Sequence, residues 1–164
     1  MLTSRDDRDD RSRLVHRSTA EKLARPSGET MLDILLAEDN PVNALLVRSI
    51  LAREGHRVTL VENGRLLVDE AMDRPDGKSR FDLVITDLSM PVLDGKSAIK
   101  MIRNREETDN LSRLPIIVLS ADGQAATRDE LLAAGADGHA EKPVDPAWLV
   151  SLVAVTARAG KARA

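Results

Sequence analysis

The chain has 164 residues, of which 42% are apolar and 31% charged, and its formal net charge is −3. These values are typical of one globular domain with a buried core, and no apolar run approaches the roughly 20 residues of a membrane-spanning helix. The absence of cysteine excludes disulfides and thiolate chemistry. Because the first residues also lack the apolar stretch of a signal peptide, we expect a cytoplasmic protein with no membrane contact.

The charged residues mix both signs, and the chain has one Phe, one Trp and no Tyr. No long basic stripe is available for nucleic-acid phosphates, and no aromatic platform is available on which bases stack. We therefore expect no direct binding to nucleic acid.

Residues 1–30 differ from the rest of the chain. They begin with a dense alternation of opposite charges, RDDRDDRSR, and end near a Pro-Ser-Gly sequence at residues 26–28, which indicates a break. We expect a solvated linker or tail here, the alternative being a short helix that continues from an upstream domain or pairs with a partner. A folded domain over residues 31–158 and a C-terminal tail over residues 159–164 complete the predicted organisation.

From residue 32 onward, short β-rich apolar runs alternate with amphipathic stretches. The apolar runs predict five strands, over residues 32–37, 56–61, 81–86, 115–120 and 137–140. The amphipathic stretches predict five helices, over residues 42–54, 64–72, 95–103, 127–135 and 145–157. Strict alternation with strands this apolar is typical of an α/β fold, a parallel sheet covered by helices on both sides. The polar connections at residues 74–80 and 104–114 are expected to be surface loops.

Residues at the ends of the predicted helices support this assignment. Asn40 suits a helix cap and Pro41 the first helical turn, while Gly55 and Gly135 stand where helices end. Within the first predicted helix, four apolar residues fall on one face at helical spacing: Val42, Leu45, Leu46 and Ile50.

Polar side chains close several of the predicted strands. Glu38 and Asp39 follow the first strand, Asp87 the third, Ser120 the fourth and Lys142 the fifth. Taken singly, each has a common structural role, because an acid after a strand often caps a helix, a serine often lies in a turn and a lysine is often solvated. Since the carboxyl ends of parallel strands meet at one edge of the sheet, we expect these side chains to converge there.

Three carboxylates at one place repel one another and raise one another's pKa unless a cation is present. With three His and no Cys, the chain offers no imidazole-rich or thiolate metal site, whereas carboxylate oxygens suit Mg²⁺, which completes its shell with water and phosphate oxygens. A carboxylate can also act as a nucleophile and form an aspartyl phosphate, with a lysine as a point charge on the phosphoryl group. The residues therefore favour Mg²⁺-dependent phosphoryl transfer to a carboxylate.

Four segments carry a family resemblance: ILLAEDNPVN, VITDLSMPVLDG, IIVLSA and AGADGHAEKP. In this order and at strand-helix spacing, they resemble the hallmark segments of response-regulator receiver domains, the phospho-accepting modules of two-component signalling and phosphorelays. The resemblance covers about residues 32–157. It implies a flavodoxin-like, doubly wound (βα)5 fold with a parallel five-stranded sheet in the order 2-1-3-4-5.

The resemblance also implies roles for the residues at the strand ends. Asp87 would be the phosphoacceptor. Asp39 would bind Mg²⁺ directly and Glu38 through water, while Asp87 and the backbone carbonyl of Ser89 would complete the protein's share of the metal shell. Lys142 would pair with the phosphoryl group.

Two further positions correspond to the family's switch residues. Ser120 would turn its hydroxyl to the attached phosphoryl group, and His139 stands where the family usually has Tyr or Phe. His139 is either a partly exposed strand residue without a special role or a side chain that swaps between inward and outward rotamers. Ser89 and Asp122 occupy positions that modulate hydrolysis of the phosphoryl group. Trp148 is expected at the flank of the last helix, either covering its edge or anchoring a partner.

By this resemblance, the partner is a histidine kinase or a histidine phosphotransfer protein that docks near the first helix and presents its phosphoryl group to Asp87. Attachment of the group would switch a protein-interaction surface around the fourth helix. The chain would thus be a signalling switch with self-directed phosphotransfer and autodephosphorylation, and not an enzyme that acts on outside substrates.

Two other functions compete with this interpretation. A Mg²⁺-dependent phosphatase with an aspartyl nucleophile would carry a second acid two residues after Asp87, where this chain has Ser89. A degenerate receiver that acts only as a scaffold would have lost an acid or the lysine, and none is missing. Because the chain ends soon after the fifth predicted helix, we expect a single-domain regulator or, preferably, the receiver of a hybrid histidine kinase.

Overall fold

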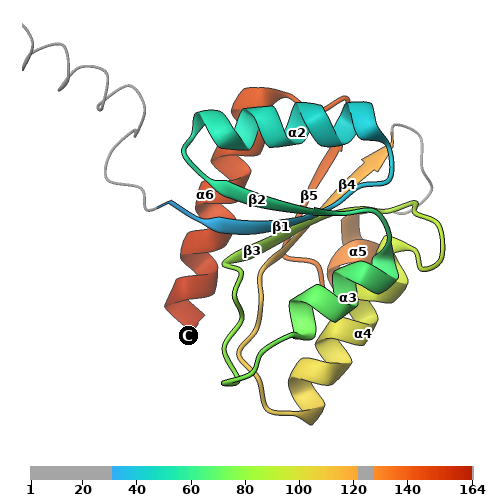
Figure 1. Cartoon of the computed structure of the whole chain (residues 1–164), viewed down its shortest axis with the longest axis vertical. Coiled ribbons are helices and arrows are strands. Elements are labelled where there is room, and N and C mark those ends of the chain that lie inside the picture. The colour runs from blue at the N-terminus through green and yellow to red at the C-terminus, as the bar shows by residue number, and fades with distance from the viewer. Residues whose placement is uncertain (1–30, 122–127, 164) are drawn as a thin grey trace, which may run out of the picture.

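The computed structural model describes residues 31–121 and 128–163, with side chains described as far as residue 161. This part of the chain forms five strands: β1 Asp33–Ala37, β2 Arg57–Val61, β3 Leu83–Asp87, β4 Ile116–Ala121 and β5 Gly138–Lys142. It also forms five helices: α2 Pro41–Arg53, α3 Gly64–Met72, α4 Gly95–Thr108, α5 Arg128–Ala134 and α6 Pro146–Arg163. Strands and helices alternate along the chain, as the sequence predicts (Figure 1).

The strands form one parallel sheet in the order β2-β1-β3-β4-β5. This is the order of the flavodoxin-like fold, so the predicted fold is confirmed. Helices α2 and α6 cover one face of the sheet, and α3, α4 and α5 cover the other (Figure 1). Strands β1 and β3 lie inside the sheet and are buried almost throughout, which explains their continuous apolar runs.

Two hydrophobic cores lie on opposite faces of the sheet, because neighbouring residues of a strand point to opposite faces. In β1, Leu35 packs in the core beneath α3 and α4, whereas Ile34 and Leu36 pack in the core beneath α2 and α6. Full burial of such a side chain contributes about 1.5–3 kcal/mol to stability. The two cores therefore fix the strands, and with them the rim at which the strands end.

The helix ends agree with the sequence signals. Asn40 caps α2, and its side-chain oxygen accepts hydrogen bonds from the backbone N–H groups of Val42 at 2.9 Å and Asn43 at 3.2 Å. A proline occupies the first position of this helix. Gly55 and Gly135 follow α2 and α5 with φ of 85° and 117°, in the left-handed region that glycine adopts without strain.

Helix α2 lies within one residue of its predicted bounds, but the apolar face of the sequence pattern is not the face that packs on the sheet. Of the four apolar residues that the sequence pattern places on one face, only Ile50 is buried, while Val42 is 75% exposed, Leu45 66% and Leu46 44%. The face against the sheet is formed by Ala44, Val47, Ile50 and Leu51. The exposed residues Val42, Leu45 and Leu46 form an apolar strip on α2, the helix that begins two residues after Asp39.

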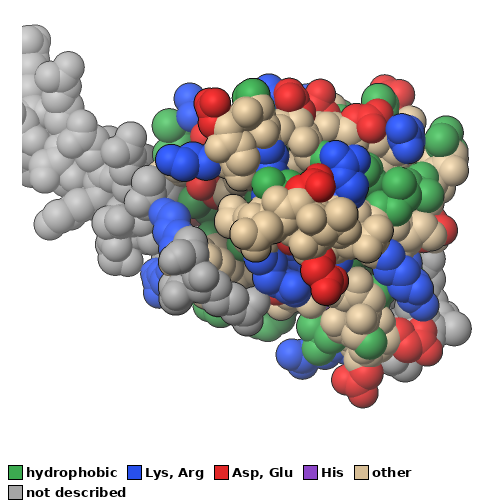
Figure 2. Space-filling view, turned by 90° about the horizontal axis from the view of Figure 1, so that it is seen from below, with side chains coloured by type: hydrophobic (Ala, Val, Ile, Leu, Met, Phe, Trp, Pro, Cys, Tyr) green, Lys and Arg blue, Asp and Glu red, His purple; other side chains and the backbone are tan. Residues whose placement is uncertain are grey.

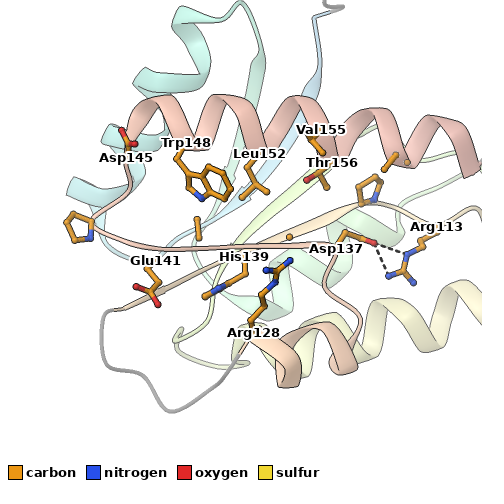
Figure 3. A pocket seen from close by; sticks show the side chains of 16 residues that line it. Arg113, Arg128, Asp137, His139, Glu141, Asp145, Trp148, Leu152, Val155 and Thr156 are labelled. Atoms are coloured by element: carbon orange, nitrogen blue, oxygen red, sulfur yellow. Dashed lines mark hydrogen bonds and ion pairs between the residues drawn. The ribbon is translucent and has the colours of Figure 1, made fainter.

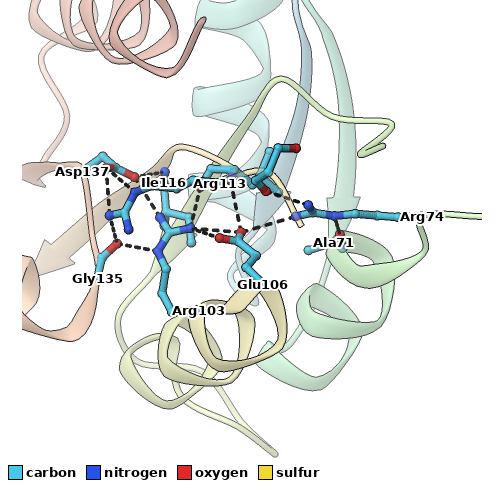
Figure 4. Close-up of polar contacts among 10 residues, drawn as sticks. Ala71, Arg74, Arg103, Glu106, Arg113, Ile116, Gly135 and Asp137 are labelled. Carbon is cyan, nitrogen blue, oxygen red and sulfur yellow. Dashed lines mark hydrogen bonds and ion pairs between the residues drawn. The ribbon is translucent and has the colours of Figure 1, made fainter. Parts of the chain in front are cut away.

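Helix α4 includes the first five residues of the segment 104–114, so the prediction of a surface loop there is wrong for these residues. The prediction fails because of Glu106, a charged residue that the sequence pattern places in a surface loop but that is buried in the structure. Its carboxylate accepts hydrogen bonds from Arg74, Arg103 and the backbone N–H of Leu114 (Figure 4). Such bonds offset the cost of burying the charge.

Further ion pairs extend this contact into an ionic cluster, formed by Arg74, Arg103, Glu106, Arg113 and Asp137 (Figure 4). Arg103 pairs with Asp137 at 2.8 Å, and Arg113 pairs with the same carboxylate at 3.0 Å. Asp137 also accepts a hydrogen bond from the backbone N–H of Ile116, the first residue of β4. The ionic cluster thus ties α4 to the segments that lead into β4 and β5.

Helix α6 continues to Arg163, past residue 158, the predicted end of the domain. The division into residues 1–30, 31–158 and 159–164 stays a prediction, and residues 1–30 lie outside the described part of the chain. Among the described residues, no helix is both long and apolar enough to cross a membrane. Figure 2 shows the molecule from below the view of Figure 1, and basic and acidic side chains are interspersed on this face.

Candidate functional site

Three carboxylates meet where β1 and β3 end. Strand β3 ends with Asp87, which is buried, and Glu38 and Asp39 follow β1 directly. The two strands are neighbours in register, with Ala37 opposite Thr86, so the three acidic side chains lie at the same rim. One carboxylate oxygen from each lies within 4.8 Å of those from the other two. The structure thus brings together the three acids that the sequence singles out.

Lys142, the last residue of β5, completes this group. Its ammonium lies 2.9 Å from Glu38 Oε2 and 3.1 Å from Asp87 Oδ2. Strand β4 lies between β3 and β5, so a long side chain is needed to reach the carboxylates from this position. The peptide bond between Lys142 and Pro143 is cis.

Burial and charge act in opposite directions on these groups. Burial raises the pKa of Glu38 above its ordinary value, in spite of the hydrogen bonds that its carboxylate accepts from Lys142 and the backbone of Asn40. Burial disfavours the charged form of Lys142, but the hydrogen bonds and charges of Glu38 and Asp87 outweigh it and raise the pKa of Lys142. Lys142 is therefore positively charged at neutral pH. Three carboxyl groups and the ammonium of Lys142 thus lie together at this rim.

The donor atoms of the site suit a hard divalent cation. All three side chains offer carboxylate oxygens, the ligand type that Mg²⁺ and Ca²⁺ prefer. Glu38 and Asp87 are buried while Asp39 is exposed, so the rim is open to solvent on the side of Asp39. Ser89, two residues beyond Asp87 in the loop after β3, is also exposed. This arrangement leaves room for the water and phosphate ligands that Mg²⁺ retains in such sites.

Two glycines, Gly64 and Gly95, let neighbouring backbone approach the loop after β3 closely. Neither glycine has a role in the sequence-based predictions. A Cβ on Gly95 would collide with the backbone oxygen of Asp87, and a Cβ on Gly64 would collide with the backbone oxygen of Leu93. Gly95 follows Asp94, the N-cap of α4. This Asp-Gly pair is the sequence signal that indicates a close backbone approach at the start of a helix. The two glycines position the backbone that carries Asp87.

Ser120 and His139 lie on neighbouring strands and are hydrogen-bonded, with 2.6 Å between Ser120 Oγ and His139 Nε2. Ser120 is buried near the end of β4, one residue beyond Leu119, which pairs with Asp87 in β3. His139 is half-buried in β5. The two predicted switch residues therefore contact each other directly. Asp122, the other residue predicted to modulate hydrolysis, lies outside the described residues.

A groove of about 620 Å³ runs along β5 and α6 (Figure 3). His139 lines it from the strand, and Trp148 and Leu152 line it from the helix. Trp148 is 53% exposed, whereas Leu149 and Val153 face the core. Trp148 thus lies at the flank of the last helix, as the sequence predicts.

Residues 34–154 match the profile of the response regulator receiver domain. The chain belongs to this family. The matched residues include Glu38, Asp39, Asp87 and Lys142, which meet at the rim of the sheet.

This receiver domain is similar to parts of much longer proteins. It is 41% identical over 121 residues to hybrid signal transduction histidine kinase M of Dictyostelium discoideum, covering 73% of this chain and 5% of that protein. It is 37% identical over 120 residues to the sensor protein GacS of Pseudomonas syringae pv. syringae, covering 73% of this chain and 13% of that protein. The chain therefore spans a small fraction of the length of these relatives.

Among solved structures, the receiver domain of the sensor histidine kinase PA1611 from Pseudomonas aeruginosa PAO1 is 36% identical. The two structures agree with a TM-score of 0.66, and the match covers 79% of this chain and 99% of that chain. That structure has a magnesium ion coordinated in its active site cleft.

Proposed function

We propose that this receiver domain accepts a phosphoryl group on Asp87 from a phosphohistidine, in a reaction that requires Mg²⁺. The observation that carries the proposal is the position of Asp87, 3.1 Å from the ammonium of Lys142 and clustered with Glu38 and Asp39. A carboxylate can attack phosphorus, but its negative charge repels the phosphoryl oxygens unless positive charge is supplied. Lys142 supplies one positive charge, and the three acids can hold a cation that supplies more.

Glu38, Asp39, Asp87 and the backbone carbonyl of Ser89 would hold the cation, a donor set made of oxygen atoms as Mg²⁺ requires. When bound, Mg²⁺ offsets the charge of the phosphoryl oxygens. In the transfer, a bond forms between a carboxylate oxygen of Asp87 and phosphorus. The bond between phosphorus and the donor imidazole breaks, and its electron pair stays on the imidazole nitrogen. Lys142 stays close to the product, where its ammonium pairs with the new phosphoryl oxygens.

The donor is a histidine kinase or a histidine phosphotransfer protein, and α2 is the surface on which we propose that it docks. The exposed apolar residues Val42, Leu45 and Leu46 lie on the helix that begins just after Asp39, beside the site. Leu46 also lines a groove of about 460 Å³ between α2 and α6, which reaches Val150. Exposed apolar surface of this kind is typical of protein contacts. It would bring a phosphohistidine to the open side of the rim.

The proposed role is that of a switch, and the chain acts on no outside substrate. Phosphorylation adds charge and acceptor oxygens at the rim, which biases a protein-interaction surface, and self-catalysed hydrolysis at the same site resets it. Because relatives such as hybrid signal transduction histidine kinase M are kinases, we propose that the domain is the receiver of a hybrid histidine kinase. It would work in the cytoplasm, where ATP supplies the phosphoryl group.

The proposal is tested by incubating the protein with Mg²⁺ and acetyl phosphate and measuring its intact mass. We expect the mass of one phosphoryl group to be added to the parent protein, to disappear when Mg²⁺ is chelated and to be missing from Asp87→Asn. Asp76→Asn, an exposed acid in the loop before β3, is the matched control and is expected to be labelled like the parent.

Labelling that persists in Asp87→Asn would mean that another residue is the acceptor. A parent protein that is labelled neither by acetyl phosphate nor by a phosphohistidine donor would overturn the proposed function and favour a scaffold that binds partners without being phosphorylated.

A further inference from the structure

The groove along β5 and α6 has the size and the lining of a small-molecule site. Its volume of about 620 Å³ lies within the range of roughly 300–1,000 Å³ that such sites occupy. Apolar side chains of α6 line it together with basic and acidic side chains (Figure 3). These side chains take no part in the proposed phosphoryl transfer or in donor docking on α2, which leaves their role open.

Trp148 belongs to the apolar wall of the groove. It is 53% exposed, and Figure 3 shows its indole over the groove beside Leu152. An exposed aromatic ring of this kind stacks on the planar ring of a nucleobase. Because the chain has a single tryptophan, the groove suits one base, that is a mononucleotide and not a nucleic-acid chain.

One end of the groove, next to the ionic cluster, carries excess positive charge. Arg113 lines the groove there, and in the ionic cluster three guanidinium groups share two carboxylates. Arg128, the first residue of α5, also lines the groove and forms no hydrogen bond or ion pair with any other residue in the described part of the chain. Figure 3 shows its side chain pointing from α5 into the groove. The planar fork of an arginine matches the geometry of a phosphate.

The other end of the groove carries acids. Asp145 lies just before α6 and accepts a hydrogen bond from the backbone N–H of Ala147. Glu141, in β5, makes no hydrogen bond or ion pair within the described residues. A carboxylate accepts hydrogen bonds from amino and hydroxyl groups and repels a phosphate. The two ends therefore orient a ligand, with its anionic group toward the arginines and its donor groups toward the acids.

We propose that this groove binds a purine nucleoside monophosphate whose base carries an amino group, such as AMP or GMP. The base stacks on Trp148, the phosphate binds to Arg128 and Arg113, and the amino group donates a hydrogen bond to Glu141. The nucleotide has its amino group and its phosphate at opposite ends, as the charges of the groove require. The inference is independent of the proposed function, because none of these residues belongs to the rim that contains Asp87.

The fluorescence of Trp148 reports on the groove directly, since the chain has no other tryptophan and no tyrosine. The full chain is titrated with AMP and with GMP in the presence of EDTA, which keeps metal ions away from the three acids at the rim. Free tryptophan amide corrects for light that the nucleotide absorbs. We expect at least one of the two nucleotides to quench the fluorescence saturably, with a dissociation constant below about 1 mM.

Partial ligands test whether both ends of the nucleotide are recognised. Adenosine and guanosine keep the base but lack the phosphate, and ribose 5-phosphate keeps the phosphate but lacks the base. We expect each of these compounds to bind at least about tenfold more weakly than the nucleotide, because stacking and the phosphate contact each contribute about that factor. These comparisons use the parent protein and need no substitution.

Substitutions test the two contacts separately, with calorimetry as the readout. Arg128→Gln is expected to weaken nucleotide binding about tenfold and to leave nucleoside binding unchanged, because only the phosphate loses its partner. Trp148→Leu is expected to weaken nucleotide binding about tenfold, because stacking is lost. Arg48→Gln, an exposed arginine on α2, is the matched control and is expected to bind like the parent. Thermal unfolding shows whether each variant is folded.

Failure of both AMP and GMP to bind the parent protein would overturn the inference. Equal nucleotide affinity in Arg128→Gln and the parent would also overturn it, and so would binding of ribose 5-phosphate as tight as that of the nucleotide. None of these outcomes bears on phosphorylation of Asp87, which the intact mass measures separately.

Discussion

The ammonium of Lys142 lies 2.9 Å from Glu38 Oε2, although the two residues are 104 positions apart in the chain. The contact crosses the sheet from the end of β5 to the end of β1, over two intervening strands. It places the ammonium between two of the acids, because the same group also reaches Asp87. A metal ion held by the three acids would therefore share carboxylates with Lys142, and each would affect the other.

Replacing this lysine separates metal binding from phosphoryl transfer. Because the ammonium repels a cation at the three acids, Lys142→Met is expected to bind Mg²⁺ roughly threefold more tightly or better. Labelling by acetyl phosphate is expected to fall by about 100-fold, since the charge that stabilises the phosphoryl group is lost. Calorimetry measures the first quantity and intact mass the second. Lys100→Met, on the exposed side of α4, is the control, and weaker Mg²⁺ binding in Lys142→Met would contradict the prediction.

The apolar strip on α2 yields a test of donor docking. Leu45→Asp is expected to slow transfer from a phosphohistidine protein at least about tenfold, because a charge in a protein contact costs binding free energy. Labelling by acetyl phosphate, which needs no docking, should stay unchanged. Leu66→Asp places the same charge on α3, on the other face of the sheet, where Leu66 is also partly exposed. If both variants slow transfer equally, α2 is not the docking surface.

Gly95 offers a test of how the backbone holds Asp87. A methyl group at this position would collide with the backbone oxygen of Asp87, so Gly95→Ala is expected to lower the free energy of unfolding by about 2–3 kcal/mol. Labelling of Asp87 should fall as well, because the end of β3 must shift. Lys96→Ala, in the same turn of α4, is expected to stay within about 0.5 kcal/mol of the parent. Urea unfolding measures the stability of both variants. Equal stability of Gly95→Ala and Lys96→Ala would show that the close approach of Gly95 to Asp87 does not contribute to stability.

Asp94 is expected to make the protein less stable in acid. The backbone N–H of Ser97 donates a hydrogen bond to its carboxylate and lowers the pKa of Asp94 below the ordinary value of 3.8. A lowered pKa in the folded protein means that this stabilisation is fully present above the ordinary pKa and is lost as the pH falls through the lower, folded value. Asp94→Asn keeps a capping oxygen without the charge, so its stability is expected to change less than that of the parent below about pH 4.

The control for Asp94 is Asn63, the N-cap of α3, whose amide does not titrate. Asn63→Ala is expected to lower stability by about 1 kcal/mol at every pH. Urea unfolding over a series of pH values measures these differences. An acid dependence in Asp94→Asn identical to that of the parent would show that Asp94 has no part in it.

Two ion pairs that involve α4 residues, Arg74 with Glu106 and Arg105 with Asp109, allow a buried and an exposed ion pair to be compared. Arg74→Met leaves the buried Glu106 with one charged partner fewer and is expected to lower the free energy of unfolding by about 3 kcal/mol. Arg105→Met breaks the ion pair between Arg105 and Asp109, two side chains that are about half exposed. It is expected to lower the free energy of unfolding by about 0.5 kcal/mol or less. Similar losses of unfolding free energy in the two variants would contradict the prediction that the buried ion pair stabilises the protein more than the exposed one.

The order of elements and the convergence of the acids could be predicted because their signals are local. Apolar runs, caps such as Asn40 and glycines such as Gly55 each act within a few residues, and the geometry of a parallel sheet then brings the strand ends to one rim. The extension of α4 could not be predicted in this way. Glu106 is polar, and its burial depends on Arg74, which is 32 residues away in the chain.

Two other features also depend on packing that no sequence pattern shows. The apolar residues of α2 lie on more than one side of the helix, so spacing alone does not tell which side packs on the sheet. The hydrogen bond between Ser120 and His139 depends on the register of β4 and β5 and on two side-chain rotamers. The resemblance to receiver domains identifies both residues, but not their contact.

The ionic cluster has a further consequence for movement within the domain. Arg103 and Asp137 hold the amino ends of β4 and β5 against α4, whereas Ser120 and Lys142 lie at the opposite ends of the same strands. One end of each strand is anchored, and the other carries a residue of the proposed site. We therefore expect a rearrangement at the rim to pivot these strands about their anchored ends, so that displacement grows with distance from the ionic cluster.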